Sequence, residues 1–241
     1  MKRFSLIKSI LFCFLYINIY IYKYIFKLNK INIYWYDFNL IIQKSQIIAI
    51  SGSNGIGKST LLETISGLQK NYDGEINFFI QDKINEGLNR SSFFFLGHLN
   101  ALKDELCVLD NLKIWTQINL LSFKDSELKK KLYYFGLNDL SNVKFNRLSF
   151  GQKRKVALTK LLLTQAKFWI LDEPCNGLDS ISEQKFIELI LKHKSQGGTV
   201  IFTSHKKYKN KNFILVDLNL WKPDKKLKVN SNIWENLWKN F

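Results

Sequence analysis

The chain has 241 residues, enough for one globular domain with a substantial core or for two small lobes. Its formal net charge of +16 fits either a nucleic-acid partner or a basic surface that faces solvent or a membrane. We favour the basic surface and expect no nucleic acid, because the residues of A- and T-rich codons (Lys, Ile, Asn, Phe and Tyr) are abundant throughout. Arginine occurs only at positions 3, 90, 147 and 154. The same bias favours an organelle or a reduced endosymbiont genome as the source.

The three cysteines, Cys13, Cys107 and Cys175, lie far apart, and no histidine cluster has the spacing of metal ligands. An odd number of separated thiols predicts a reducing compartment, without a disulfide framework or a structural metal.

The first 29 residues are expected to form a strand or an extension. Ser9–Tyr22 carries no charge and follows Met-Lys-Arg, which leaves three interpretations open: a strand, a membrane-associating extension or a cleaved signal. We favour the strand, because the run is too short to span a bilayer and is rich in Ile, Tyr and Phe. No apolar run elsewhere in the sequence is long enough to span a bilayer either. A membrane process would therefore need another polypeptide to supply the pore.

Strand-like alternation up to about residue 50 predicts an antiparallel β layer, and residues 52–60 then read GSNGIGKST between an apolar run and a helix-like run. This is the strand–loop–helix setting of a phosphate-binding P-loop, in which glycines let successive amides approach a polyphosphate. Lys58 is placed to reach the β- and γ-phosphates, and Ser59 to ligate Mg²⁺. The predicted ATP-binding residues are Gly52, Ser53, Asn54, Gly55, Ile56, Gly57, Lys58, Ser59 and Thr60.

Further along the chain, buried strands alternate with helices. A turn at Asp73-Gly74 is expected to lead into a strand, and apolar runs predict strands at 93–98, 167–174 and 199–205. Helical patterns cover 106–140, 151–165 and 180–196, with Gly136 as an interruption. The sequence therefore predicts an α/β core, residues 30–99 and 151–220, with a helical subdomain over 100–150 and a tail over 221–241.

Polar residues at strand and helix ends supply candidate chemistry. Ser149 in the stretch LSFGQ precedes a helix, where it caps the helix or contacts a phosphate. Asp172 ends a strand, where it can hold Mg²⁺ through water, and Glu173 beside it can orient or deprotonate a water molecule. His205 ends the next strand at the same edge of the sheet.

Together these motifs resemble the nucleotide-binding domain of ATP-binding-cassette (ABC) proteins over about residues 30–217. GSNGIGKST is similar to the Walker A motif, LSFGQ to the signature, WILDEP to Walker B, Gly177–Asp179 to the D-loop and His205 to the switch histidine. The resemblance implies a P-loop NTPase fold with a RecA-like core, and Mg²⁺-ATP as substrate.

The resemblance also implies a mechanism. Two copies would pair head to tail, with Ser149, Gly151 and Gln152 of one copy meeting the ATP held by the other. Glu173 would position water, and His205 would sense the γ-phosphate. Phe150 stands where the family usually has glycine, and we expect activity to survive this departure.

Residues 95–115 resemble one subfamily, the ATPase subunit of the haem-linked exporter of cytochrome c maturation, and His98 falls where most ABC proteins place the Q-loop glutamine. The subfamily is similar in having histidine there, although Leu99, Asn100 and Ala101 replace its Gln-Pro-Gly. This resemblance implies a catalytic role for His98, a separate membrane permease and haem-handling partners. The location would be peripheral on the ATP-containing side, at the mitochondrial matrix face or the bacterial cytoplasmic membrane.

Two alternatives stay open at this stage: an ABC ATPase acting on a soluble scaffold, of the iron–sulfur assembly type, and the ATPase of another ABC transporter. A translation factor of this family is disfavoured, because that type normally carries two cassettes and a long linker, which are not seen in this sequence. The aromatic side chain that would stack on adenine is not selected by spacing, with Tyr24 or Phe26 preferred. Near the C-terminus, apolar residues at helical spacing predict core packing or a partner contact (Ile233, Trp234, Leu237, Trp238 and Phe241).

Overall fold

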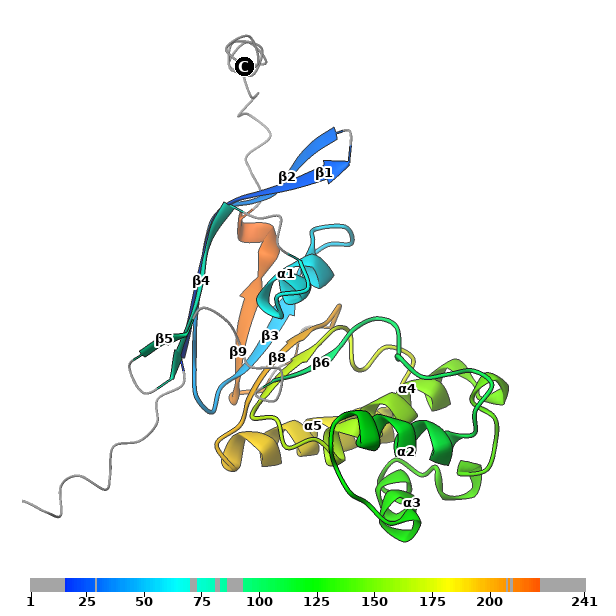
Figure 1. Ribbon diagram of the computed structural model, residues 1–241. Helices are drawn as coiled ribbons and strands as arrows, with labels where there is room; N and C mark the ends of the chain where they lie inside the picture. The colour runs from blue at the N-terminus through cyan, green and yellow to red at the C-terminus, as the bar shows by residue number, and fades with distance from the viewer. Residues whose placement is uncertain are drawn as a thin grey trace, which may run out of the picture.

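The computed structural model describes residues 16–28, 30–69, 73–80, 83–85, 93–206, 208 and 210–221. They form two sheets, with a group of helices to one side (Figure 1). The first sheet is antiparallel and has the strand order β2-β1-β4-β5. Its strands are β1 (Tyr16–Leu28), β2 (Lys30–Gln43), β4 (Asp73–Ile80) and β5 (Lys83–Asn85).

This sheet confirms the antiparallel β layer and corrects its limits. Because β1 pairs with β2 on one side and β4 on the other, the described part of Ser9–Tyr22 is an interior strand; residues 9–15 lie outside the described chain. Asp73 and Gly74 belong to β4, so the turn expected there is wrong. The layer also ends at Gln43 and does not continue to residue 50, because the next strand joins the other sheet.

The second sheet is parallel, with the order β6-β7-β8-β3-β9, and lies between two apolar cores. Along β3 the side chains alternate between these cores: Ile48 and Ile50 pack with helix α1 and β2, whereas Ile47 and Ala49 pack with the helices on the opposite face. Burial on both faces explains the nearly continuous apolar runs of the interior strands at 47–51, 168–171 and 199–203, whereas the edge strand at 213–217 exposes Ile214 and Leu215. The strands are β3 (Ile47–Ser51), β6 (Phe93–Leu96), β7 (Phe168–Leu171), β8 (Thr199–Thr203) and β9 (Phe213–Asp217).

The helices are α1 (Lys58–Ile65), α2 (Val108–Ile118), α3 (Asp125–Tyr134), α4 (Phe150–Thr159) and α5 (Ser180–Ser195). Short 3₁₀ turns occur at Asn138–Leu140, Phe145–Arg147, Lys160–Leu162 and Leu218–Trp221. No helix in the described residues is long and apolar enough to cross a bilayer.

The helical region predicted over 106–140 is two helices rather than one. Helix α2 ends where Leu120 takes a left-handed backbone conformation (φ 55°), and α3 starts anew with the Glu127 carboxylate accepting a hydrogen bond from the Lys124 amide at 2.7 Å. Gly136, with φ of 70°, ends α3 as predicted. The helix predicted over 151–165 is α-helical only to Thr159 and then continues as a 3₁₀ turn.

A buried histidine joins α5 to the parallel sheet. The His193 ring stacks on Trp169 with centroids 3.6 Å apart, and its Nε2 lies 3.0 Å from the carbonyl oxygen of Lys167. Burial lowers the pKa of His193 to about 4. The neutral ring therefore donates its Nε2 hydrogen to Lys167 in the folded protein.

This burial predicts a loss of stability in mild acid. The unfolded chain takes up a proton on His193 below about pH 6.5, whereas the folded chain resists protonation down to about pH 4. The contribution is therefore complete above pH 6.5 and declines as the pH falls through this window. We expect His193 to account for about 1 to 2 kcal/mol of lost unfolding free energy at pH 5, measured by urea unfolding. His193→Gln should flatten this part of the profile, and an unchanged slope would contradict the assignment.

Candidate active site

The phosphate-binding loop connects β3 to α1. Gly55 (φ 73°) and Gly57 (φ 98°) both take left-handed backbone conformations, and Gly57 is the N-cap of α1. A residue with a Cβ is strained in these conformations, which explains the glycines at these positions. The loop thus ends at a helix N-terminus, where exposed amides favour an anion.

Lys58 is only 6% exposed, and its Nζ donates to the carbonyl oxygens of Gly52 and Ser53 at 3.0 and 3.3 Å. The loop is also held by hydrogen bonds to a residue much later in the chain, Asn219. The Asn219 side-chain oxygen accepts hydrogen bonds from the amide and hydroxyl of Ser53, at 3.3 and 2.9 Å, and the Asp217 carboxylate fixes Asn219. No pattern in the sequence pointed to Asn219, which lies 166 positions from Ser53.

A pocket of about 420 Å³ brings the loop together with the candidate catalytic residues. His98, Glu173 and His205 follow β6, β7 and β8, which are neighbouring parallel strands and therefore end at one edge of the sheet. The prediction that Glu173 and His205 lie at one edge of the sheet is confirmed, and the structure adds His98 to them. The catalytic roles of all three stay predictions. The lining residues are Asn54, Gly55, Gly57, Lys58, Ser59, Thr60, His98, Glu173 and His205.

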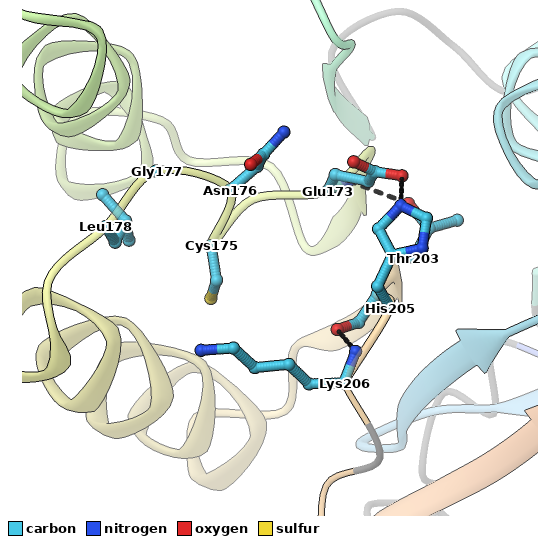
Figure 2. Close-up of a pocket in the computed structure, with 9 residues that line it drawn as sticks. Glu173, Cys175, Asn176, Gly177, Leu178, Thr203, His205 and Lys206 are labelled. Atoms are coloured by element: carbon cyan, nitrogen blue, oxygen red, sulfur yellow. Dashed lines mark hydrogen bonds and ion pairs between the residues drawn. The ribbon is translucent and has the colours of Figure 1, made fainter. Parts of the chain in front are cut away.

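Glu173 lies at the centre of this arrangement and is mostly buried, with 17% of its side chain exposed. His205 Nε2 is 2.6 Å from Glu173 Oε1, and the Glu173 amide donates to the Thr203 hydroxyl at 2.8 Å (Figure 2). The Glu173 backbone is left-handed, with φ of 45°, a strained conformation for a residue that is not glycine. His205 lies two residues beyond the end of β8, so the prediction that it ends the strand is slightly wrong.

A second pocket of about 280 Å³ adjoins the first and contains the predicted metal ligands, Ser59 and Asp172, together with His98. Asp172 is 3% exposed and accepts a hydrogen bond from the Thr203 hydroxyl at 2.7 Å. Burial and the charge of Asp172 raise the pKa of Glu63, which also lines this pocket. A hydroxyl, a carboxylate and space beside the phosphate loop fit Mg²⁺, which prefers hard oxygen ligands and substrate phosphates.

The signature residues lie at the start of α4 and not in this pocket. The Ser149 hydroxyl accepts from the Gln152 amide at 3.3 Å, and the Gln152 side chain accepts from the Ser149 amide at 2.9 Å, forming a capping box. A Cβ at Gly151 would clash with the carbonyl oxygen of Gly177, and the half-exposed Phe150 ring packs against Gly177. One chain therefore does not bring its signature to its own pocket, which lacks Ser149, Gly151 and Gln152.

Lys155 joins this helix to the next. Asp179, in the predicted D-loop, is the N-cap of α5 and pairs with Lys155 at 2.6 Å. The hydrogen bond from Lys155 holds the pKa of Asp179 well below its usual range.

The sequence interpretation missed Thr203 and Arg154. Thr203 bridges Asp172 and Glu173, and the signal was a polar residue at the end of an apolar strand. Arg154 donates hydrogen bonds to the main chain on both sides of Glu173. The sequence feature that could have pointed to it is the use of arginine in a chain whose basic residues are mostly lysine. The side chains of Tyr24 and Phe26, and the C-terminal apolar residues, lie outside the described part of the chain.

Comparison with known proteins identifies the class. The sequence profile of the ABC transporter family matches residues 36–176, more than half of the chain. The chain therefore belongs to the ABC transporter family, and its fold is that of the ATPase cassette. Among solved structures, a putative ABC transporter ATP-binding protein from Pyrococcus furiosus has a TM-score of 0.70 and 26% identity, covering 86% of this chain and 100% of that one. A dimeric bacterial ABC transporter cassette, at 23% identity and a TM-score of 0.70, shares the fold.

Curated relatives indicate a narrower group within this family. The chain is 36% identical over 171 residues to the cytochrome c biogenesis ATP-binding export protein CcmA of Reclinomonas americana, covering 70% of this chain and 77% of that protein. The protein of the same name from Bartonella henselae is 40% identical over 163 residues, covering 66% of this chain and 75% of the relative.

Proposed function

We propose that this chain is the ATP-hydrolysing subunit of the haem-linked membrane exporter of cytochrome c biogenesis. The observation that carries the proposal is the similarity to cytochrome c biogenesis ATP-binding export proteins, together with a pocket that His98 lines with the phosphate loop. The membrane permease is a separate polypeptide, and haem-handling maturation proteins are the expected partners. The chain lies on the ATP-containing side, at the mitochondrial matrix face or the bacterial cytoplasmic membrane.

Hydrolysis follows from the residues of the pocket. The phosphate loop and Lys58 hold the β- and γ-phosphates, and Ser59 and Asp172 would hold Mg²⁺, which would offset the charge of the phosphates. Glu173 accepts a hydrogen bond from the attacking water and orients it toward the γ-phosphate. His205, which contacts Glu173 here, turns to the γ-phosphate when ATP is bound.

A second copy completes the site. Ser149, Gly151 and Gln152 lie outside their own chain's pocket, which supports a head-to-tail dimer in which they meet the partner's ATP. A bacterial ABC transporter cassette with this fold has been solved as a dimer, which supports the pairing of two copies. ATP-driven closure of the dimer would then change the conformation of the permease, with the loop that carries His98 transmitting the movement.

Purification with bound partners tests this function. A tagged Glu173→Gln chain, taken from its own membranes in detergent with Mg²⁺-ATP, is expected to retain a multi-span membrane subunit and haem-handling proteins, identified by mass spectrometry. Lys58→Ala, purified in parallel, should retain less of both because its dimer does not close. Recovery of soluble iron–sulfur scaffold proteins alone, or of an unrelated permease, would overturn the pathway and leave the ATPase assignment standing.

A further inference from the structure

Arg154 is a buried cation on helix α4 whose hydrogen bonds go to neutral acceptors. It is 3% exposed, and its guanidinium donates to three main-chain carbonyl oxygens and one side-chain amide oxygen. Burial lowers the pKa of Arg154, yet a guanidinium stays protonated at neutral pH. A buried charge is costly unless its donors are satisfied, so this side chain constrains the groups around it.

Two of the acceptors lie on either side of Glu173. Nη2 donates to the carbonyl oxygen of Asp172, and Nε donates to that of Pro174 at 3.3 Å. The Glu173 amide donates a hydrogen bond at 2.8 Å to the hydroxyl of Thr203, which lies at the end of the neighbouring strand β8. The strained backbone of Glu173 is therefore fixed at its own amide and at both neighbouring carbonyls, which sets the direction of its side chain.

The other two acceptors lie in the loop that carries His98. Nη1 donates to the carbonyl oxygen of Gly97 and to the side-chain oxygen of Asn100, each at 3.1 Å. Lys160, the C-cap of α4, donates to the Asn100 carbonyl oxygen at 2.8 Å. One helix, which begins at the signature, thus holds both the loop of His98 and the segment of Glu173.

We propose that Arg154 is a positioning residue, whose guanidinium fixes Glu173 and the His98 loop in one arrangement relative to the helix that begins at Ser149. The proposal rests on the proposed ATPase function and adds a residue that acts through Glu173 without touching substrate. Through Arg154, helix α4 thus connects the signature of a chain to Glu173 of the same chain, the carboxylate proposed to orient the attacking water. Lysine cannot replace it, because a single ammonium group cannot reach acceptors on both sides of Glu173 and in the loop together.

The test compares Arg154→Lys in two backgrounds. In the otherwise native chain we expect kcat for ATP to fall roughly 10- to 100-fold, because a small displacement of a catalytic group is costly. The Kd for radiolabelled ATP should stay within about threefold, because the phosphate loop is not changed. In the Glu173→Gln background, where the carboxylate is already lost, the same substitution should change residual single-turnover hydrolysis by less than about twofold.

A general structural defect would give a different pattern. Equal factors in the two backgrounds, or an unchanged kcat, would overturn the proposal, as would parallel losses in kcat and ATP affinity. Lys153→Gln is the matched control, since it removes the neighbouring cation, whose pairing with Asp104 at 3.5 Å is a surface contact. A native chain without ATPase activity would instead refute the proposed function itself.

Asn100→Ala gives a second route if Arg154→Lys does not fold. It removes one acceptor of the same guanidinium, so that the guanidinium holds the carbonyl oxygens on either side of Glu173 less firmly. We expect a smaller loss of kcat, roughly 3- to 10-fold, again confined to the chain that retains Glu173. An equal loss in the Glu173→Gln background would contradict the proposal.

Discussion

Replacing Glu173 by glutamine is expected to stop ATP hydrolysis while leaving ATP binding intact. Glutamine keeps the shape and can still contact His205, but it cannot accept a proton from water. Loss of a general base costs roughly 10²- to 10⁴-fold in rate, so kcat should fall by that range in a phosphate-release assay. ATP affinity should be retained, because the proposed mechanism assigns the phosphates to the loop and Lys58, which this substitution leaves unchanged.

The same variant should accumulate a closed dimer when ATP is present. In the proposed mechanism hydrolysis ends the closed state, so a chain that binds but does not cleave ATP should stay paired, which size-exclusion chromatography with Mg²⁺-ATP would detect. Glu188→Gln is the matched control, because it makes the same substitution at an exposed carboxylate on α5, whose hydrogen bond within the described chain comes from Gln184 at the surface. Unchanged turnover in Glu173→Gln would remove Glu173 from its assigned role.

Replacing Lys58 by alanine should weaken nucleotide binding. The ammonium group is already nearly buried and held over the loop by two carbonyl oxygens, so little ordering remains to be done when phosphate arrives. A charged hydrogen bond of this kind contributes about 1.5 to 3 kcal/mol, which corresponds to a roughly 10- to 100-fold increase in Kd. Equilibrium binding of radiolabelled ATP measures the effect directly.

The control for Lys58 is Lys192→Ala, which removes an exposed lysine on α5 and the same unit of charge. A difference between the two variants therefore reports the site rather than the general electrostatic attraction of a basic protein for ATP. Undiminished binding by Lys58→Ala would contradict the assignment of the loop to phosphate.

The sequence by itself determined the features that depend on near neighbours in the chain. Glycines at 55 and 57 set the phosphate loop because the required backbone conformations are local, and Ser149 with Gln152 forms its capping box within four residues. Strand ends at Asp172 and near His205 could be assigned to one edge, since buried apolar runs of parallel strands end together.

The tertiary structure decided what depends on partners far apart in the chain. Ile47–Ser51 could have continued the antiparallel layer by its pattern alone, and only its pairing with β8 and β9 assigned it to the parallel sheet. Arg154 reads as one more basic helix residue until packing buries it against carbonyls 18 and 57 positions away. Periodicity records which face of an element is buried, whereas the choice of hydrogen-bond partners is made only when distant segments pack together.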